Sequence, residues 1–130
     1  MEDRLPRRSG RPWVEKFRCA FRGTWWGIRG QRSFVVHFAF AAAVLACAAG
    51  FRVSKQEWCL LLLCMALVWG AEMFNSALEN LAKAISEREH VQLGVALDIS
   101  SGAVLVAALG AAAVGTVIFL DHLAKTLGWW

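Results

Sequence analysis

Three long stretches without formal charge constrain the fold of this chain more than any other feature of its sequence. They are Phe34–Gly50, with 17 residues, Trp58–Ala71, whose helical pattern continues to about Ala84, and Ile99–Leu120, with 22 residues. A helix that crosses a bilayer needs about 20 mostly apolar residues, with about 17 as the lower limit. A soluble domain of 130 residues has too small an interior for a sequence that is 58% hydrophobic. We therefore predict an all-α membrane protein with three transmembrane helices.

Basic residues near the N-terminus predict how the chain is oriented in the membrane. Nine of the 14 Lys and Arg residues lie in residues 1–32. Because positive charge favours the cytoplasmic side, the N-terminus is expected in the cytoplasm, with the Phe51–Glu57 connection outside and the Lys83–Val95 connection inside. A basic cluster can also indicate nucleic acid, but directly before a span the topological interpretation is favoured. We therefore expect no nucleic-acid partner.

The composition divides the chain into four parts. Residues 1–12 are polar and basic without an apolar core, so we expect a disordered arm and no cleavable signal peptide. Residues 13–30 precede the first span, residues 31–122 hold the three spans, and residues 123–130 form a short tail. The third apolar stretch is rich in Gly and Ala, which let helices approach closely, so its helix is expected at the centre of a packed bundle.

Residues 13–30 carry an apolar stripe. Trp13, Phe17, Phe21 and Thr24 or Trp25 recur at steps of three and four residues, with Lys and Arg on much of the remaining surface. This pattern is typical of an amphipathic helix that lies in the headgroup layer of a membrane. The alternative, a soluble basic helix, would leave these aromatic rings without burial.

Polar residues at the end of the second apolar stretch point to a functional site. Glu72, Asn75 and Glu79 are three, four and seven residues apart, which places them on one face of a helix. Asp98 begins the third span at the same cytoplasmic level. Ionisable groups at membrane depth are energetically costly and usually functional. The alternatives without a functional role are that the side chains of Glu79 and Asp98 extend to the membrane–water interface and that Glu72 makes a buried hydrogen bond to Asn75 or Ser76.

This constellation suits phosphoryl transfer to a lipid. Clustered carboxylates bind Mg²⁺, which commonly takes one or two carboxylates together with phosphate oxygens. A deeper carboxylate beside apolar neighbours can act as a general base. Glu72 would then deprotonate a lipid hydroxyl while Mg²⁺ and ATP occupy the shallower positions.

Four segments resemble the prokaryotic diacylglycerol kinases, a family of small membrane enzymes that includes the undecaprenol kinases. The most specific is Glu72–Glu79, EMFNSALE, which matches a Glu-x-x-Asn-Ser/Thr-x-x-Glu signature. Ala96–Val104 is similar to a second family motif, and Phe17–Gly23 to the family's surface helix. Phe34 followed by His37 is similar to the undecaprenol kinase branch. The resemblance covers about residues 15–120.

The resemblance implies an activity and roles for individual residues. Glu72 would be the catalytic base, Asn75 would position groups around it, Glu79 would hold Mg²⁺ on ATP, and Asp98 would contact the nucleotide. The fold would be a homotrimer of three-span chains with active sites shared between protomers, in the bacterial inner membrane. The second substrate would be diacylglycerol or undecaprenol, and His37 favours the polyprenol branch.

Three positions depart from the family pattern. Gln31 stands where the family usually has a second metal-binding glutamate, Lys83 where it has Asp, and Leu97 where it has Lys. The oxygen of an amide can still coordinate Mg²⁺, but without charge, so Gln31 remains a candidate ligand. Lys83 can contact phosphate as a point charge, and Arg22 and His90 complete the candidate nucleotide-binding set.

Two other classes of function remain open from the sequence. The departures are compatible with a catalytically inactive family member that serves as a structural or interaction protein. A small transporter could use Glu72 as a proton carrier, but it would need further polar residues toward the outer side of the membrane. The outer halves of the spans are Leu, Val, Ala and Trp, which disfavours that pathway.

Overall fold

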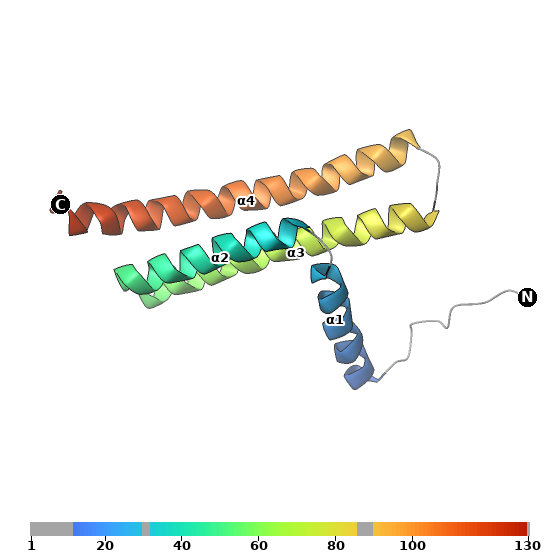
Figure 1. The fold of residues 1–130 in the computed structure, drawn as a ribbon, viewed down its shortest axis with the longest axis horizontal. Helices are drawn as coiled ribbons and strands as arrows, with labels where there is room; N and C mark the ends of the chain where they lie inside the picture. Colours follow the sequence, from blue (N-terminus) through green and yellow to red (C-terminus); the bar gives the residue numbers. More distant parts are fainter. Residues whose placement is uncertain (1–11, 30–31, 86–89, 130) are drawn as a thin grey trace, which may run out of the picture. The chain divides into compact units, whose positions relative to one another are not determined.

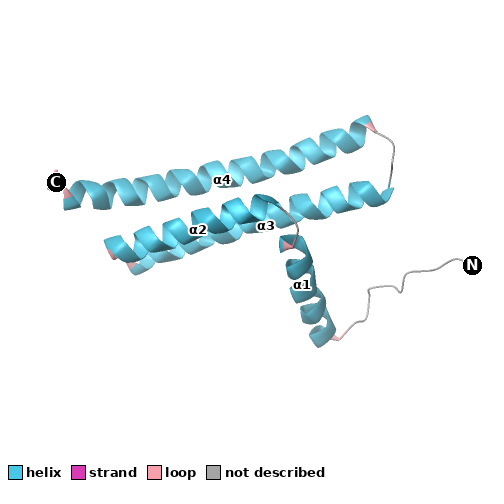
Figure 2. Cartoon of the chain, viewed as in Figure 1, coloured by secondary structure: helices cyan, strands magenta, loops and turns pink. Residues whose placement is uncertain are grey.

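The computed structural model describes residues 12–29, 32–85 and 90–129, and these residues are almost entirely helical (Figures 1 and 2). In chain order the helices are α1 (Trp13–Ile28), α2 (Arg32–Phe51), α3 (Lys55–Ile85) and α4 (Val91–Thr126). The chain separates into two compact units, Met1–Gly30 and Gln31–Trp130. Helix α1 thus belongs to one unit and the three long helices to the other. The expected order of one shorter helix followed by three long helices is confirmed.

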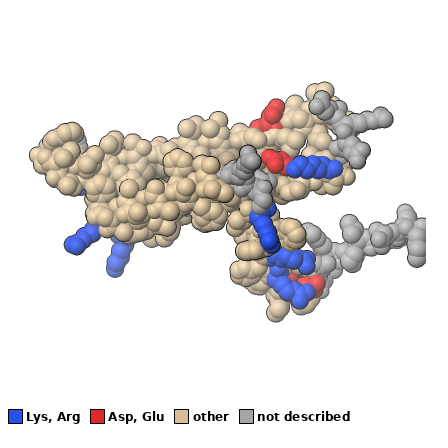
Figure 3. All heavy atoms as spheres, in the orientation of Figure 1, with Lys and Arg blue, Asp and Glu red and all other residues tan. Residues whose placement is uncertain are grey.

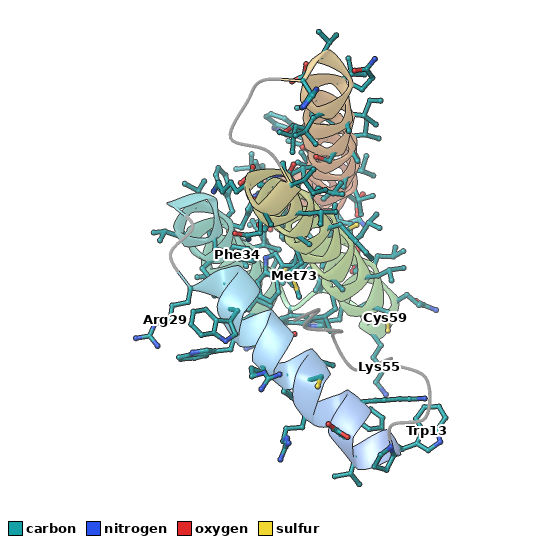
Figure 4. All side chains as sticks on the ribbon, turned by 90° about the vertical axis from the view of Figure 1, so that its right-hand side faces the viewer. Trp13, Arg29, Phe34, Lys55, Cys59 and Met73 are labelled. Carbon is teal, nitrogen blue, oxygen red and sulfur yellow. The ribbon has the colours of Figure 1, made fainter. Side chains whose placement is uncertain are left out.

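Helix α1 has no buried residue. Trp13 and Phe21 are 73% and 76% exposed, although both are large and apolar. Cations lie over two of its rings: Lys16 Nζ is 4.7 Å from the centroid of Trp13, and Arg29 Cζ is 5.6 Å from that of Trp25. Figure 4 labels Trp13 and Arg29 near the two ends of this helix. A helix with exposed aromatic rings and cations around them suits a headgroup layer, and its place there stays a prediction.

The three long helices are all long and apolar enough to cross a membrane. At 1.5 Å per residue, the 31 residues of α3 and the 36 of α4 extend about 46 Å and about 54 Å. Both lengths exceed the roughly 30 Å hydrocarbon core of a bilayer. Figure 3 shows charged atoms of this unit near the two ends of the helices, with an uncharged stretch between them on the visible face.

The helices are longer than the sequence predicted, because polar residues near their ends are helical. The predicted connection Phe51–Glu57 shrinks to three residues, since α3 begins at Lys55. The predicted connection Lys83–Val95 also shrinks, because α3 continues to Ile85 and α4 begins at Val91. Lys, Glu and Gln are good helix formers, so polarity alone does not end a helix.

The turn between α2 and α3 is held by two capping motifs. The N–H of Val53 donates to Ala48 O and that of Arg52 to Ala49 O, a Schellman arrangement in which Arg52 adopts a left-handed φ of 53°. Next, the Ser54 N–H donates to Glu57 Oε2 at 2.6 Å, and the Glu57 N–H donates to Ser54 Oγ at 3.3 Å. This reciprocal pair is a capping box and explains why α3 starts there.

A small apolar core lies at this end of the bundle. Its buried members come from α2, the turn, α3 and α4: Ala48, Val53, Leu61 and Ile118. The rings of Phe51 and Phe119 pack beside it, with centroids 6.1 Å apart. The core therefore ties all three long helices together at the end where α2 and α3 connect.

Within the single chain α4 is less enclosed than α3, and its expected place at the centre of a packed bundle stays a prediction. Helix α3 carries six buried residues, whereas α4 carries three. A Cβ added at Gly102 or Gly110 would meet no atom within 4 Å, so no neighbouring backbone approaches α4 at these glycines in the described chain. Helix α3 packs mainly against α4, while α2 contacts both less extensively.

Candidate functional site

The polar residues of α3 lie on one face of the helix and are largely enclosed. Glu72, Asn75 and Ser76 are 5%, 7% and 1% exposed, and Glu79 is partly buried. Their spacing of three and four residues places them above one another on the side that packs against neighbouring helices. Few side chains of the three long helices are this buried. Because buried side chains are usually apolar, a group of buried polar side chains marks a candidate site.

Helix α4 contacts this face through two serines. The Ser100 Oγ lies 2.6 Å from Asn75 Oδ1, and Ser101 Oγ lies 3.3 Å from the same oxygen. Both hydroxyls are also within reach of the Leu97 carbonyl, at 2.8 Å and 3.0 Å. Each hydroxyl has one hydrogen to donate. If each hydroxyl donates its hydrogen once, Ser100 Oγ donates to Asn75 Oδ1 and Ser101 Oγ donates to the Leu97 carbonyl oxygen.

The amide of Asn75 connects this link to a carboxylate. Asn75 Nδ2 donates to Glu79 Oε1 at 3.0 Å, one turn further along α3. Because Ser100 occupies the amide oxygen, the amide nitrogen is directed toward Glu79. Ser100, Asn75 and Glu79 thus form a chain of hydrogen bonds that fixes both the amide and one oxygen of Glu79. A buried amide held at both ends has a defined orientation.

Helix α2 contributes a histidine beside the deeper carboxylate. His37 Nε2 lies 3.8 Å from Glu72 Oε2, and the side chains are 20% and 6% exposed. That separation is too long for a direct hydrogen bond but close enough for electrostatic attraction when the imidazole is charged. Phe34, which lies one turn earlier on α2 and is labelled in Figure 4, is buried. Glu72 therefore lies where α2 and α3 meet.

Several predicted site residues lie outside this cluster. Asp98 is exposed on α4 and makes none of the hydrogen bonds just described. Lys83 is exposed, and the described ion pairs include none between Lys83 and Glu79. His90 is exposed immediately before α4. In the parts of the chain that the structure describes, no three His, Cys, Asp or Glu side chains are grouped closely enough to hold a metal ion.

Two predicted residues cannot be placed against the cluster. Gln31 lies outside the described residues. Arg22 is on α1, which belongs to the other compact unit. Their candidate roles as metal ligand and nucleotide-binding cation therefore stay predictions.

Sequence reasoning missed the contacts of Ser100 and Ser101. Both lie in the second family-like motif. The charge of Asp98, two and three residues earlier, made that residue the predicted contribution of this helix to the site. The signal was present: two serines open an otherwise uncharged span, and hydroxyls at membrane depth usually hydrogen-bond across helices. His37 was noted only as a mark of a family branch, and its position beside Glu72 emerges from the fold.

Comparison with known proteins confirms the resemblance. The family described as prokaryotic diacylglycerol kinase matches residues 18–119. The chain is similar to an undecaprenol kinase of Bacillus subtilis, with 34% identity over 84% of this chain and 89% of the relative. It is also similar to a diacylglycerol kinase of Synechocystis sp., with 32% identity over 82% of this chain and 62% of that relative, so it spans less than two thirds of the second protein.

No solved structure is significantly similar to this chain. The family match alone covers most of the chain and includes every residue of the α3 and α4 polar cluster. Both relatives also align over more than four fifths of this chain. The chain therefore belongs to the prokaryotic diacylglycerol kinase family, whose members are membrane lipid kinases that use ATP.

Proposed function

We propose that this protein transfers the γ-phosphate of ATP to the hydroxyl of a membrane lipid, either diacylglycerol or undecaprenol. One observation carries the proposal: Glu72 is a 5% exposed carboxylate within a membrane-length helix, one turn from the hydrogen-bonded chain of Asn75 and Glu79. A carboxylate at this depth is costly unless it has a function. The printed names of the two relatives supply the two candidate lipids.

In the proposed reaction Glu72 is the general base. The lipid O–H bond breaks as its proton moves to Glu72, and the lipid oxygen attacks the γ-phosphorus. The bond from that phosphorus to the β–γ bridging oxygen breaks, and ADP leaves with the bonding electrons. The products are a phosphorylated lipid and ADP. Phosphoryl transfer depends mainly on alignment and charge neutralisation, which a small set of side chains can supply.

The nucleotide end of the site is proposed to use Mg²⁺, held by Glu79 with Gln31 as a neutral second ligand. Both groups offer hard oxygens, and Mg²⁺ commonly takes one or two protein oxygens while the phosphates supply others. The amide hydrogen bond from Asn75 holds one oxygen of Glu79 and leaves the other available. Mg²⁺ would neutralise phosphate charge. Asp98, Lys83, Arg22 and His90 are the proposed contacts to ATP.

The same proposal places the protein in the bacterial inner membrane as a homotrimer, with its N-terminus in the cytoplasm. The concentration of Lys and Arg in residues 1–32 supports the orientation. Two features support the assembly: the largely exposed apolar surface of α4 and the few contacts of α2. Residues 13–30 would lie on the membrane surface, residues 31–122 would form the kinase domain, and residues 123–130 would be a tail.

The direct test measures phosphate transfer in detergent micelles. Purified protein is incubated with γ-labelled ATP, Mg²⁺ and either diacylglycerol or undecaprenol, and lipid-bound phosphate is counted. Glu72→Gln is the key variant, because it keeps the shape of the side chain and removes the base. Glu79→Gln and Asn80→Asp serve as comparisons, since Asn80 is exposed on the same turn of α3. Transfer by the wild type that Glu72→Gln abolishes supports the proposal and identifies the lipid.

An inactive family member is the second candidate, favoured by Gln31, Lys83 and Leu97. It predicts no transfer to either lipid by the wild type. Restoring the family residues in Gln31→Glu or Lys83→Asp would then produce activity if only the metal and nucleotide contacts had been lost. These variants distinguish a degenerate kinase site from an unrelated function.

A further inference from the structure

Helix α1 exposes aromatic rings and cations side by side. Trp13, Phe17 and Phe21 are exposed and form its apolar stripe. Lys16 and Arg18, which lie between them in the sequence, are exposed as well. Figure 3 shows the blue atoms of Lys and Arg gathered over this helix. Helix α1 therefore presents both apolar area and positive charge on its surface.

The cations flank the apolar stripe on both sides. With 3.6 residues per turn, Arg18 and Arg22 follow the stripe along one edge of the helix, and Lys16 lies beyond the other edge. A helix that turns its apolar side into a bilayer holds the flanking side chains among the lipid headgroups. The positions of these cations therefore match the level of the lipid phosphates.

Two cations also lie directly over aromatic rings. Lys16 Nζ is 4.7 Å from the centroid of Trp13, and Arg29 Cζ is 5.6 Å from the centroid of Trp25. These pairs hold a positive charge next to an indole ring near each end of α1. Indole rings favour the membrane–water interface, and a guanidinium can form two parallel hydrogen bonds with a phosphate. Each pair thus combines an apolar group for the bilayer with a donor for a headgroup.

The positive charge of this region is not neutralised within it. Residues 1–32 contain nine basic and three acidic side chains. Among the residues that the structure describes, no ion pair involves Lys16, Arg18 or Arg22. The cytoplasmic leaflet, where the N-terminus is expected, carries a negative surface potential when anionic lipids are present. A zwitterionic surface has no net charge to attract the helix, so charge complementarity favours an anionic surface.

We propose that α1 docks on a bilayer surface rich in anionic phospholipids and that its cations select these lipids over zwitterionic ones. The apolar stripe alone predicts attachment to any bilayer, and the flanking cations add the selection by headgroup charge. The partner is the surrounding lipid surface and not the lipid that receives phosphate. The inference is therefore independent of the proposed kinase reaction.

Amide hydrogen exchange of the full chain in nanodiscs tests the docking without any turnover. A helix of 16 residues is only marginally stable in water, so the amides of α1 exchange slowly only where a surface stabilises the helix. Discs of phosphatidylcholine alone are compared with discs that contain about 30% phosphatidylglycerol. We expect exchange in residues 13–28 to be about tenfold slower in the anionic discs. Raising the NaCl concentration to about 0.5 M should remove most of that difference.

A matched pair of variants assigns the selection to the cations of α1. The double variant Lys16→Gln and Arg18→Gln removes one cation from each side of the apolar stripe, and Gln has a helix propensity close to that of Lys and Arg. It should reduce the difference between the two discs to about twofold. Lys55→Gln removes an exposed cation at the start of α3 and should keep the wild-type difference. Arg22 is left unchanged because it is also a proposed contact to ATP.

Three outcomes overturn the inference. Equal exchange of the wild type in both discs shows that headgroup charge is not selected, and this comparison needs no variant to fold. Slow exchange that a short RNA induces, and that anionic discs do not, identifies nucleic acid as the partner. Exchange that depends on the number of chains per disc and not on the lipid shows that a second copy covers α1. Absence of phosphate transfer, measured separately, removes the kinase proposal and leaves this inference standing.

Discussion

Helices α3 and α4 are joined by two polar links that differ in depth and surroundings. At one end, His122 Nε2 lies 3.1 Å and 3.2 Å from the two oxygens of Glu57, and these side chains are 20% and 23% exposed. Further along, Ser100 contacts Asn75 at 2.6 Å, and both residues are buried. The first link uses residues at the helix ends, and the second lies within the helices.

The difference separates a structural link from a site. Glu57 also caps α3 through Ser54, so its carboxylate stabilises a helix end that needs hydrogen-bond acceptors. Asn75 caps nothing, and the backbone groups around it are already paired in the helix. Burial of Asn75 therefore stabilises no helix end. Its buried amide needs hydrogen-bond partners, which Ser100 and Glu79 provide. Polar groups that are buried without a structural need are the better candidates for chemistry.

The largest expected difference between the buried polar face of α3 and the Glu57–His122 link is in turnover. Glu72→Gln should reduce phosphate transfer by at least about 100-fold, the lower range for removal of a general base. Glu57→Gln should leave transfer near the wild-type value, because its contacts lie at the opposite end of α3. Initial rates at saturating ATP and lipid give the comparison. Similar losses of activity in both variants would mean that Glu72 has no special role in the reaction.

A smaller effect is expected from the serine that orients Asn75. Ser100→Ala removes the 2.6 Å contact and leaves Asn75 Oδ1 with Ser101 at 3.3 Å. Leaving a buried acceptor poorly satisfied costs about 1–3 kcal/mol, and the freed amide no longer holds Glu79 in place. We expect kcat to fall about tenfold, with Mg²⁺ required at higher concentration.

Ser100→Thr is the control for this positioning role, since it keeps the hydroxyl. It should retain more activity than Ser100→Ala at a similar melting temperature. If both substitutions lower the melting temperature equally and leave the Mg²⁺ dependence unchanged, Ser100 only packs the two helices together.

The link between Glu57 and His122 should affect stability and not catalysis. His122→Ala removes the partner of Glu57 and should lower the melting temperature in detergent by a small amount, because the pair is partly exposed. Glu57→Gln should lower it more, since it weakens both the pair and the capping box. A variant with both changes should show a loss smaller than the sum, because the two residues share one contact.

The smallest effect is expected at the turn between α2 and α3, next to Glu57. Arg52 adopts a left-handed φ of 53°, which costs an L-residue about 1–2 kcal/mol and a glycine almost nothing. Arg52→Gly should therefore raise the melting temperature slightly, after subtracting the extra freedom of glycine in the unfolded chain. Arg52→Ala is the control and should give no increase. An equal gain in both variants would show that the charge of Arg52, and not its backbone, matters.

Periodicity and composition predicted the elements well because hydrophobic length and spacing act locally. The three uncharged stretches became α2, α3 and α4, and the four-residue aromatic repeat became α1. The helix ends were less accurate: Lys55 was assigned to a connection but lies in α3. Its helical state depends on the Ser54–Glu57 capping box, which begins the helix at this point.

The candidate site divides in the same way. The common face of Glu72, Asn75 and Glu79 follows from their spacing and needed no tertiary information. The partners of that face did not follow from it, because contacts between helices depend on the rotation and depth at which each helix packs. Asp98 was the expected contribution of α4, yet Ser100 and Ser101, two and three residues later, make the contact to Asn75.

By itself, the sequence determined that this chain forms membrane-length helices with a polar face on α3, and it showed the resemblance to a lipid kinase family. Length, hydropathy and helical period are properties of consecutive residues, so they can be obtained without coordinates. Only the tertiary structure decided that His37 lies beside Glu72 and that Ser100 orients Asn75. These contacts join residues 25 and 35 positions apart, and a difference of one residue in helix rotation turns a side chain by about 100°.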